Sequence, residues 1–151
     1  MKASTNQSFI VGILETGMLI DQIVQKSLKT HNITHAQYNV LRILNGAFPE
    51  ALCMKDVKSK MIMPASDLTR LADRLETKKL IIRGECPNNR RKINIMITPK
   101  GQELLIESWP EIKLSLNNFF TDSISESQAE DGIQTISAVK DYLKEKIHEE
   151  R

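Results

Sequence analysis

The sequence predicts a mainly α-helical protein with one small β-hairpin, an α+β fold that 151 residues most simply form as a single domain. In most of the chain, apolar residues recur three or four positions apart, which is the period of one buried helix face. One run, residues 92–97, alternates apolar and polar residues, as a half-buried strand does. Hydrophobic residues make up 40% of the chain and charged residues 26%, so a buried core is expected.

Two helices are expected in the first third of the chain. The first spans residues 9–28 and carries Gly17 in its apolar stripe, where we expect the backbone of another helix to approach closely. The second begins at Thr34, because Thr34 and Gln37 have the spacing of a capping box, and it ends near Gly46.

The middle of the chain predicts two short helices separated by a tight turn. MKDVKSKM, from Met54, forms the first helix. Residues 65–79 form the second after a break at Pro64, a residue that suits the first turn of a helix. The second helix buries one stripe and turns a polar face outward, which is the signature of a helix-turn-helix. The outward residues are Ser66, Thr69, Arg70, Asp73 and Arg74.

A β-hairpin is expected next. Its strands are Leu80–Arg83 and residues 92–97, and residues 84–91 connect them with PNNRR at the tip. Thr98 is then placed to cap a helix whose first residue is Pro99.

Two long helices complete the chain. The first covers residues 99–120, and Pro110 should kink it or force an irregular turn. The second runs to about residue 149 and opens with another capping-box pair, Ser125 and Gln128. The terminal helices carry more apolar surface than one small domain covers, so we expect them to bury it against each other and against a second copy of the chain.

Positive charge is concentrated in the middle of the chain. Residues 54–92 hold eleven Lys or Arg against five Asp or Glu, although the net charge of the whole chain is only +2. Two adjacent arginines, Arg90 and Arg91, lie at the hairpin tip. This asymmetry indicates either an anionic partner or a solvated basic face, and charge alone does not decide between them.

Other classes of protein find little support in the sequence. No apolar run approaches the roughly 20 residues of a membrane span. Two cysteines, Cys53 and Cys86, make no disulfide framework and suit a bacterial, reducing cytoplasm. No catalytic motif is present, and the three histidines lack the spacing of a zinc site, so neither an enzyme nor a metal is expected. No cofactor is expected either.

In its motifs the chain resembles the MarR family of winged helix-turn-helix regulators. The match runs from ITHAQYNVLRIL through DLTRLADRLETKKLI to NNRRKINIMITPKGQELL, in the family's order. The resemblance implies a homodimer that binds a pseudo-palindromic operator in double-stranded DNA as a ligand- or stress-responsive repressor. It implies a winged helix-turn-helix in residues 34–98, and dimerisation helices in residues 1–33 and 99–151.

The resemblance also assigns residues to DNA binding. It places Pro64, Ala65, Ser66, Thr69 and Arg70 on the recognition helix. Arg91 takes the position of the wing arginine that enters the minor groove, with Arg90 beside it. Lys55, Lys58 and Lys60 are expected to contact phosphates, which gives salt-dependent affinity without sequence preference. An arginine suits a narrow minor groove, because that groove concentrates negative potential.

Three positions depart from the family pattern. Asn89 replaces an aspartate that pairs with the arginine matched here by Arg74, so wing support by Arg74 and Asn89 would rest on a hydrogen bond. Lys79 replaces a glycine and must tolerate or avoid a left-handed turn, and Lys58 replaces a small residue. These departures motivate an alternative, a winged-helix protein-interaction module without DNA affinity. A further alternative is a regulator gated by oxidation of Cys86.

Overall fold

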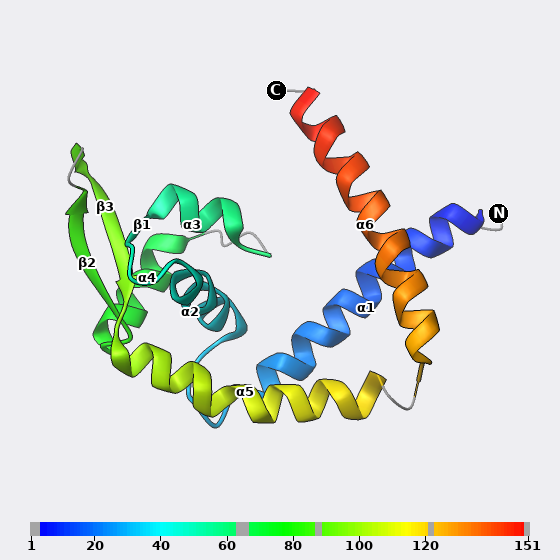
Figure 1. Cartoon of the computed structure of the whole chain (residues 1–151), viewed down its shortest axis with the longest axis horizontal. Coiled ribbons are helices and arrows are strands. Elements are labelled where there is room, and N and C mark those ends of the chain that lie inside the picture. The colour runs from blue at the N-terminus through cyan, green and yellow to red at the C-terminus, as the bar shows by residue number, and fades with distance from the viewer. Residues whose placement is uncertain (1–3, 63–66, 87–88, 121–122, 150–151) are drawn as a thin grey trace. The chain divides into compact units, whose positions relative to one another are not determined.

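The computed structural model describes residues 4–62, 67–86, 89–120 and 123–149 (Figure 1). Within this part of the chain, six helices and a three-stranded sheet confirm the predicted α+β class. The chain divides into two compact units, residues 1–116 and 117–151. The elements are α1 (Thr5–Ser27), α2 (His35–Ala47), β1 (Leu52–Cys53), α3 (Met54–Lys60), α4 (Leu68–Thr77), β2 (Ile81–Cys86), β3 (Asn89–Ile97), α5 (Pro99–Phe120) and α6 (Glu126–Glu149).

Helix α1 begins four residues earlier than the sequence pattern predicts. Ser4 and Gln7 form a capping box, in which the Ser4 N–H donates to Gln7 Oε1 at 2.9 Å and the Gln7 N–H donates to Ser4 Oγ at 3.3 Å. Nothing lies within 4 Å of a Cβ built on Gly17, so the close approach expected there does not occur among the described residues of this chain.

The expectation that no apolar run approaches the length of a membrane span is wrong for α1. By length and composition α1 is apolar enough to cross a membrane, although only 6% of its apolar window is buried in the structure. The core helix of a soluble protein can be as long and as apolar, so α1 is only weak support for a membrane span.

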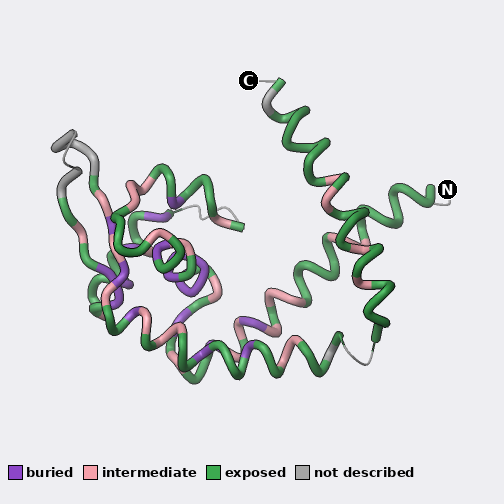
Figure 2. The backbone as a smooth tube through the Cα atoms, in the orientation of Figure 1, coloured by how far each residue is buried: buried purple, intermediate pink, exposed green. Residues whose placement is uncertain are grey.

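Helix α2 is the centre of the first unit (Figure 2). It begins as predicted with a capping box, in which Thr34 and Gln37 exchange hydrogen bonds of 3.0 and 3.2 Å. Six of its residues are buried: Gln37, Tyr38, Asn39, Val40, Leu41 and Leu44. Burial raises the pKa of the Tyr38 hydroxyl above its ordinary value, with Arg42 acting weakly in the opposite direction, so the phenol stays neutral.

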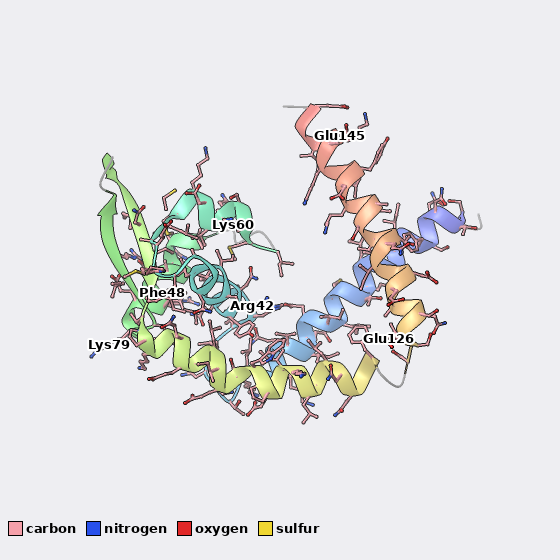
Figure 3. The ribbon with its side chains drawn as sticks, viewed as in Figure 1. Arg42, Phe48, Lys60, Lys79, Glu126 and Glu145 are labelled. Carbon is pink, nitrogen blue, oxygen red and sulfur yellow. The ribbon has the colours of Figure 1, made fainter. Side chains whose placement is uncertain are left out.

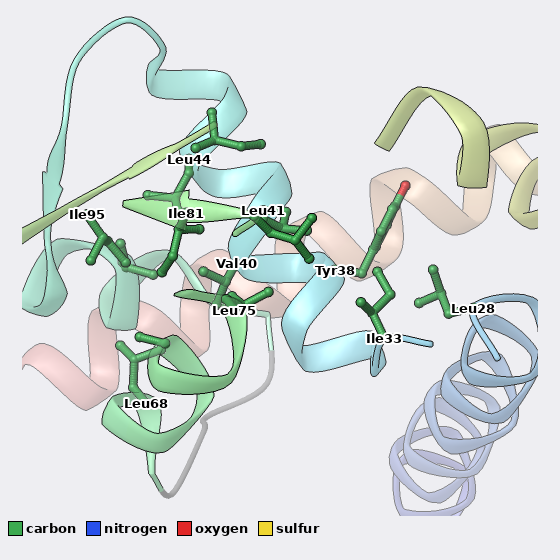
Figure 4. Packing of buried hydrophobic residues seen from close by; sticks show 14 of the residues in the cluster. Leu28, Ile33, Tyr38, Val40, Leu41, Leu44, Leu68, Leu75, Ile81 and Ile95 are labelled. Carbon is green, nitrogen blue, oxygen red and sulfur yellow. The ribbon is translucent and has the colours of Figure 1, made fainter. Parts of the chain in front are cut away.

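The core joins α2 to the sheet and to α4 (Figure 4). Leu41 and Leu44 of α2 are fully buried, as are Leu75 of α4 and Ile81 and Ile95 of the sheet. Burying one such side chain contributes about 1.5–3 kcal/mol. At the other end of α2, Leu28 and Ile33 extend the same cluster towards α1.

The sheet has the strand order β1-β3-β2, and both pairings are antiparallel. Strand β1 was not predicted, because two residues are too few to show a period. The connection predicted at residues 84–91 is too long: β2 extends to Cys86, and β3 begins at Asn89. The predicted first strand stops where the apolar residues stop, but the backbone pairing continues through Gly84 and Glu85, which lie opposite Asn94 and Ile93.

The turn from α4 into β2 depends on Lys79. Its φ of 60° is left-handed, and its N–H donates to the Glu76 carbonyl at 2.8 Å. The Leu80 N–H donates to the Leu75 carbonyl at 3.0 Å, which completes a Schellman motif between two buried leucines. The lysine therefore adopts the turn that a glycine would make without strain, and its side chain points into solvent (Figure 3).

Helix α5 packs against this turn through Gly101. The Thr98 hydroxyl donates to the Lys79 carbonyl at 2.8 Å and accepts from the Gly101 N–H at 3.1 Å. A Cβ at Gly101 would lie 2.4 Å from the Leu80 carbonyl oxygen, so glycine is required here. One continuous helix passes through Pro110, without the predicted irregular turn. The proline leaves the carbonyl of Ile106 without its helical partner, and Ile106 lies on the solvent-exposed face.

Helix α6 belongs to the second unit. Ser125 and Gln128 cap it as predicted, with hydrogen bonds of 2.9 and 3.3 Å. Its apolar stripe is largely exposed: Ile133, Ile136, Leu143 and Ile147 are each about half or more accessible to solvent. This face lacks a cover within the described chain.

We expect Lys79→Gly to stabilise the protein by about 0.5–1 kcal/mol, because glycine removes the steric cost of the left-handed backbone. The free energy of unfolding from urea titration measures this. Lys113→Gly, at an exposed position inside α5, is the matched control and should destabilise by about 0.5–1 kcal/mol. Equal destabilisation by both substitutions would show that the Lys79 backbone is unstrained.

Candidate nucleic-acid interface

Helix α3 exposes three lysines on one short element. Lys55, Lys58 and Lys60 are all exposed, whereas Val57 is fully buried and holds the helix on the core (Figure 3 labels Lys60). The buried valine fixes which side of α3 faces solvent, so the cations are presented outward.

Helix α4 has a buried face and a polar outer face. Leu68, Ala72 and Leu75 are buried, and Thr69 and Arg70 are exposed. The helix begins at Leu68, where Asp67 accepts the Arg70 N–H at 3.0 Å. The predicted contact residues Pro64, Ala65 and Ser66 lie outside the described residues.

Arg70 is highly exposed. Its side chain is 81% exposed, and its Nε lies 3.0 Å from Asp67 Oδ2. An ion pair so open to water contributes little stability, so Arg70 can leave Asp67 for another acceptor at small cost. The terminal nitrogens of its guanidinium could form the fork that reads a guanine edge.

The hairpin carries the two arginines close to its tip. Strand β3 begins at Asn89, whose backbone lies opposite Cys86, and Arg90 and Arg91 follow in the same strand. The side chains of residues 85, 86 and 89–92 lie outside what the structure describes. Their strand positions place Arg90 and Arg91 on the projecting end of the hairpin (Figure 1).

An arginine missed by sequence reasoning holds the hairpin to α4. Arg83 of β2 places Nη2 2.5 Å from Asp73 Oδ1 and Nε 3.3 Å from Glu76 Oε2. It also donates to the Thr69 carbonyl at 3.4 Å. The Arg83 side chain is only 21% exposed, so water screens these charges less than at the surface. The signal in the sequence was Asp73 and Glu76, three apart on one helix face with an arginine in the next strand.

Arg74 lies elsewhere. Its exposed side chain lines a pocket with residues of α1 and α2, and it takes no part in the Arg83 ion pairs. Wing support by Arg74 and Asn89 remains a prediction, since the Asn89 side chain is not described.

Polar contacts fix α1 to α2 and α5. His35, the first residue of α2, places Nδ1 2.5 Å from Asp21 Oδ1, and its N–H donates to Gln25 Oε1 at 2.9 Å. The Ser27 hydroxyl donates to Ser115 Oγ of α5 at 2.9 Å. The Thr30 hydroxyl donates to Glu111 of the same helix at 3.1 Å. The first helix is therefore joined to the region that carries α3 and α4.

Of the two cysteines, the structure describes the side chain of Cys53. Its thiol is free and donates to Asp56 Oδ2 at 3.0 Å in the first turn of α3. The Cys86 side chain lies outside the described residues, so its role as an oxidant sensor stays a prediction.

Two curated relatives are similar to the chain over most of their length. The HTH-type transcriptional regulator MhqR of Bacillus subtilis is 26% identical over 111 residues, which cover 74% of each chain. The homoprotocatechuate degradative operon repressor of Escherichia coli is 25% identical over 108 residues, which cover 72% of each chain. No protein-family model matches.

Solved structures show the same fold. A MarR family transcriptional regulator from Streptomyces coelicolor, solved in complex with DNA, superposes with a TM-score of 0.81 at 19% identity, covering 95% of this chain and 91% of that one. BpsR of Bordetella bronchiseptica, whose structure concerns regulation of DNA binding by 6-hydroxynicotinic acid, gives 0.78 at 19% identity, with 93% and 99% covered. The predicted resemblance is thus confirmed at the level of the fold.

We expect the Arg83 ion pairs to stabilise the hairpin measurably. A double-mutant cycle of Asp73→Ala with Arg83→Ala should give a coupling energy of about 0.5–1 kcal/mol in urea unfolding, because Arg83 is partly shielded. The control cycle of Asp67→Ala with Arg70→Ala, a pair open to water, should give less than about 0.5 kcal/mol. Equal couplings would mean that the shielding of Arg83 has no energetic effect.

Proposed function

We propose that this chain, which resembles MarR-family regulators in fold and HTH-type transcriptional regulators in sequence, is itself a transcriptional regulator that binds double-stranded DNA as a homodimer. One observation carries the proposal. The polar face of α4 and the arginine-bearing hairpin are joined by the Arg83 ion pairs, so both can meet one duplex together.

Each element has a distinct role in this proposal. Helix α4 enters the major groove and presents Thr69 and Arg70 to base edges or phosphates, and the preceding residues Pro64, Ala65 and Ser66 contribute further contacts. The lysines of α3, Lys55, Lys58 and Lys60, neutralise backbone phosphates. Arg91 reaches the adjacent minor groove, with Arg90 beside it.

The exposed apolar helices support dimerisation. Leu14 and Met18 of α1 are 61% and 65% exposed, and the stripe of α6 is equally open. A soluble chain rarely leaves such faces uncovered, and a second copy would cover them. We assign residues 34–98 to DNA binding, and residues 1–33 and 99–151 to the dimer. The operator would then contain two half-sites about 34–36 Å apart.

The relatives support one direction of regulation. One curated relative is named as a repressor, and one neighbouring structure concerns a small molecule that regulates DNA binding. We infer that this protein is a repressor released when an effector shifts the separation of its two recognition helices. A bacterial cytoplasm is the compartment in which such a regulator meets its operator.

The alternative, an interaction module without DNA affinity, is less well supported. Lys79 was one motive for it, but Lys79 adopts the left-handed turn that the fold requires. The substitution at Lys58 adds a cation to the exposed face of α3, which favours DNA binding rather than opposing it.

We expect the purified protein to shift DNA from its own promoter region in a gel at low salt. Arg91→Ala should weaken binding by more than about 1 kcal/mol and lower the salt dependence, because it removes one minor-groove cation. Lys113→Ala, which removes a cation from α5, is the control and should bind normally. A chain that shifts no promoter DNA at low salt is an interaction module. Unchanged binding by Arg91→Ala over a salt series would exclude the wing role.

We expect Leu14→Glu to convert a dimer into monomers, because it places a charge in the apolar face of α1. Size-exclusion chromatography with light scattering measures the mass. Gln22→Glu, at an exposed polar position of the same helix, should leave the dimer intact. A monomeric parent protein would contradict the dimer outright.

A further inference from the structure

A pocket of about 410 Å³ lies between the end of α1, the start of α2 and the end of α4. Its volume is within the range of small-molecule sites, about 300–1,000 Å³. All its lining residues belong to the first unit. They are Gln25, Lys29, Asn32, Ile33, Thr34, Gln37, Arg74, Thr77 and Lys78.

The charge of the lining is positive and unopposed. Lys29 in the turn after α1, Arg74 in α4 and Lys78 at the C-cap of α4 supply three cations, and the lining contains no Asp or Glu. Within the described part of the chain, no ion pair joins any of these side chains to a carboxylate. The Lys78 ammonium donates to the Asn32 carbonyl, which uses one of its protons and leaves its charge in place.

The neutral side chains also offer donors. The Oε1 atom of Gln25 accepts the His35 N–H, and Oε1 of Gln37 accepts the Thr34 N–H. Each glutamine has therefore committed this oxygen to a backbone N–H, and its NH2 group carries the remaining donors. Helix α2 also begins at the pocket, where the partial positive charge of a helix N-terminus favours anions.

The lining favours a charged ligand over an aromatic one. Ile33 is its one apolar side chain, and no aromatic ring is available to stack on a base or a phenyl group. A ligand with a single charge would leave two of the three cations unneutralised. The chemistry is that of a small molecule with two or three carboxylates and little apolar surface.

We propose that this pocket binds a small polycarboxylate anion. Carboxylate oxygens accept charge-assisted hydrogen bonds from Arg74, Lys29 and Lys78, and the glutamine NH2 groups complete the set. The site stands independently of the proposed function, since binding is measured on the chain without DNA. Because the anion would touch both α1 and α4, its binding and the position of α4 are linked.

Isothermal titration calorimetry tests the proposal with citrate as the probe, at about physiological salt so that diffuse surface charge is screened. We expect one saturable site per chain. Lys29→Gln and Arg74→Gln should each weaken citrate binding by about tenfold, because each removes a charge-assisted hydrogen bond. Lys26→Gln removes the same charge from the last turn of α1, three residues away and outside the pocket lining, and should change the affinity by less than about twofold.

Three results would overturn the proposal. The first is no saturable citrate binding, and the second is an equal loss in Lys26→Gln and Lys29→Gln. The third is binding of neutral triethyl citrate or of inorganic phosphate as tight as that of citrate, because the site would then not require several carboxylates. Circular dichroism of each variant establishes that it is folded, and Arg74→Lys should restore part of the lost affinity because it restores the charge.

Discussion

The buried face of α2 is the constraint on which the rest of the first unit depends. Val40, Leu41 and Leu44 are fully buried, and α2 contacts α1, α3, α4 and β3. The position of each outward residue on α3 and α4 is set by which side of its helix meets this core. The proposed DNA-binding surface is therefore a consequence of packing, because the polar residues lie where the apolar stripe does not.

Ion pairs and turn contacts hold the elements of this unit together in addition to the apolar core. The Arg83 ion pairs fix β2 to α4, and the left-handed Lys79 sets the turn between them. Thr98 and Gly101 then pack α5 on the same turn. Helix α4 and the hairpin are thus connected by the chain itself, by buried leucines and by the ion pairs. The apolar pattern of the sequence indicates the buried leucines but not the ion pairs.

Much of the fold could be predicted from local signals in the sequence. Capping boxes at Thr34 and Ser125 and the apolar stripes predicted the six helices, since both signals are periodic or short in range. Two bounds differ from the prediction: α1 begins four residues earlier, and α4 is Leu68–Thr77 where residues 65–79 were expected. Strand β1 could not be predicted, because its two residues pair with β3 far along the chain. The Arg83 ion pairs and the basic pocket were missed for the same reason: each unites residues from separate elements. The outward faces of α3 and α4 were predictable from amphipathicity alone.

The Arg83 ion pairs occupy one side of α4, so the sides of this helix have different roles. One side is buried, one carries Asp73 and Glu76 towards β2 together with Thr69, whose carbonyl also accepts from Arg83, and one holds Arg70 in solvent. Substitutions on the solvent side leave both the core and the anchoring carboxylates untouched. Single changes at the outer positions could therefore alter the chemistry of this face without a loss of stability. A change at Asp73 or Glu76 would remove an ion pair with Arg83. We therefore expect sequence variation to concentrate on the solvent-facing side of the helix.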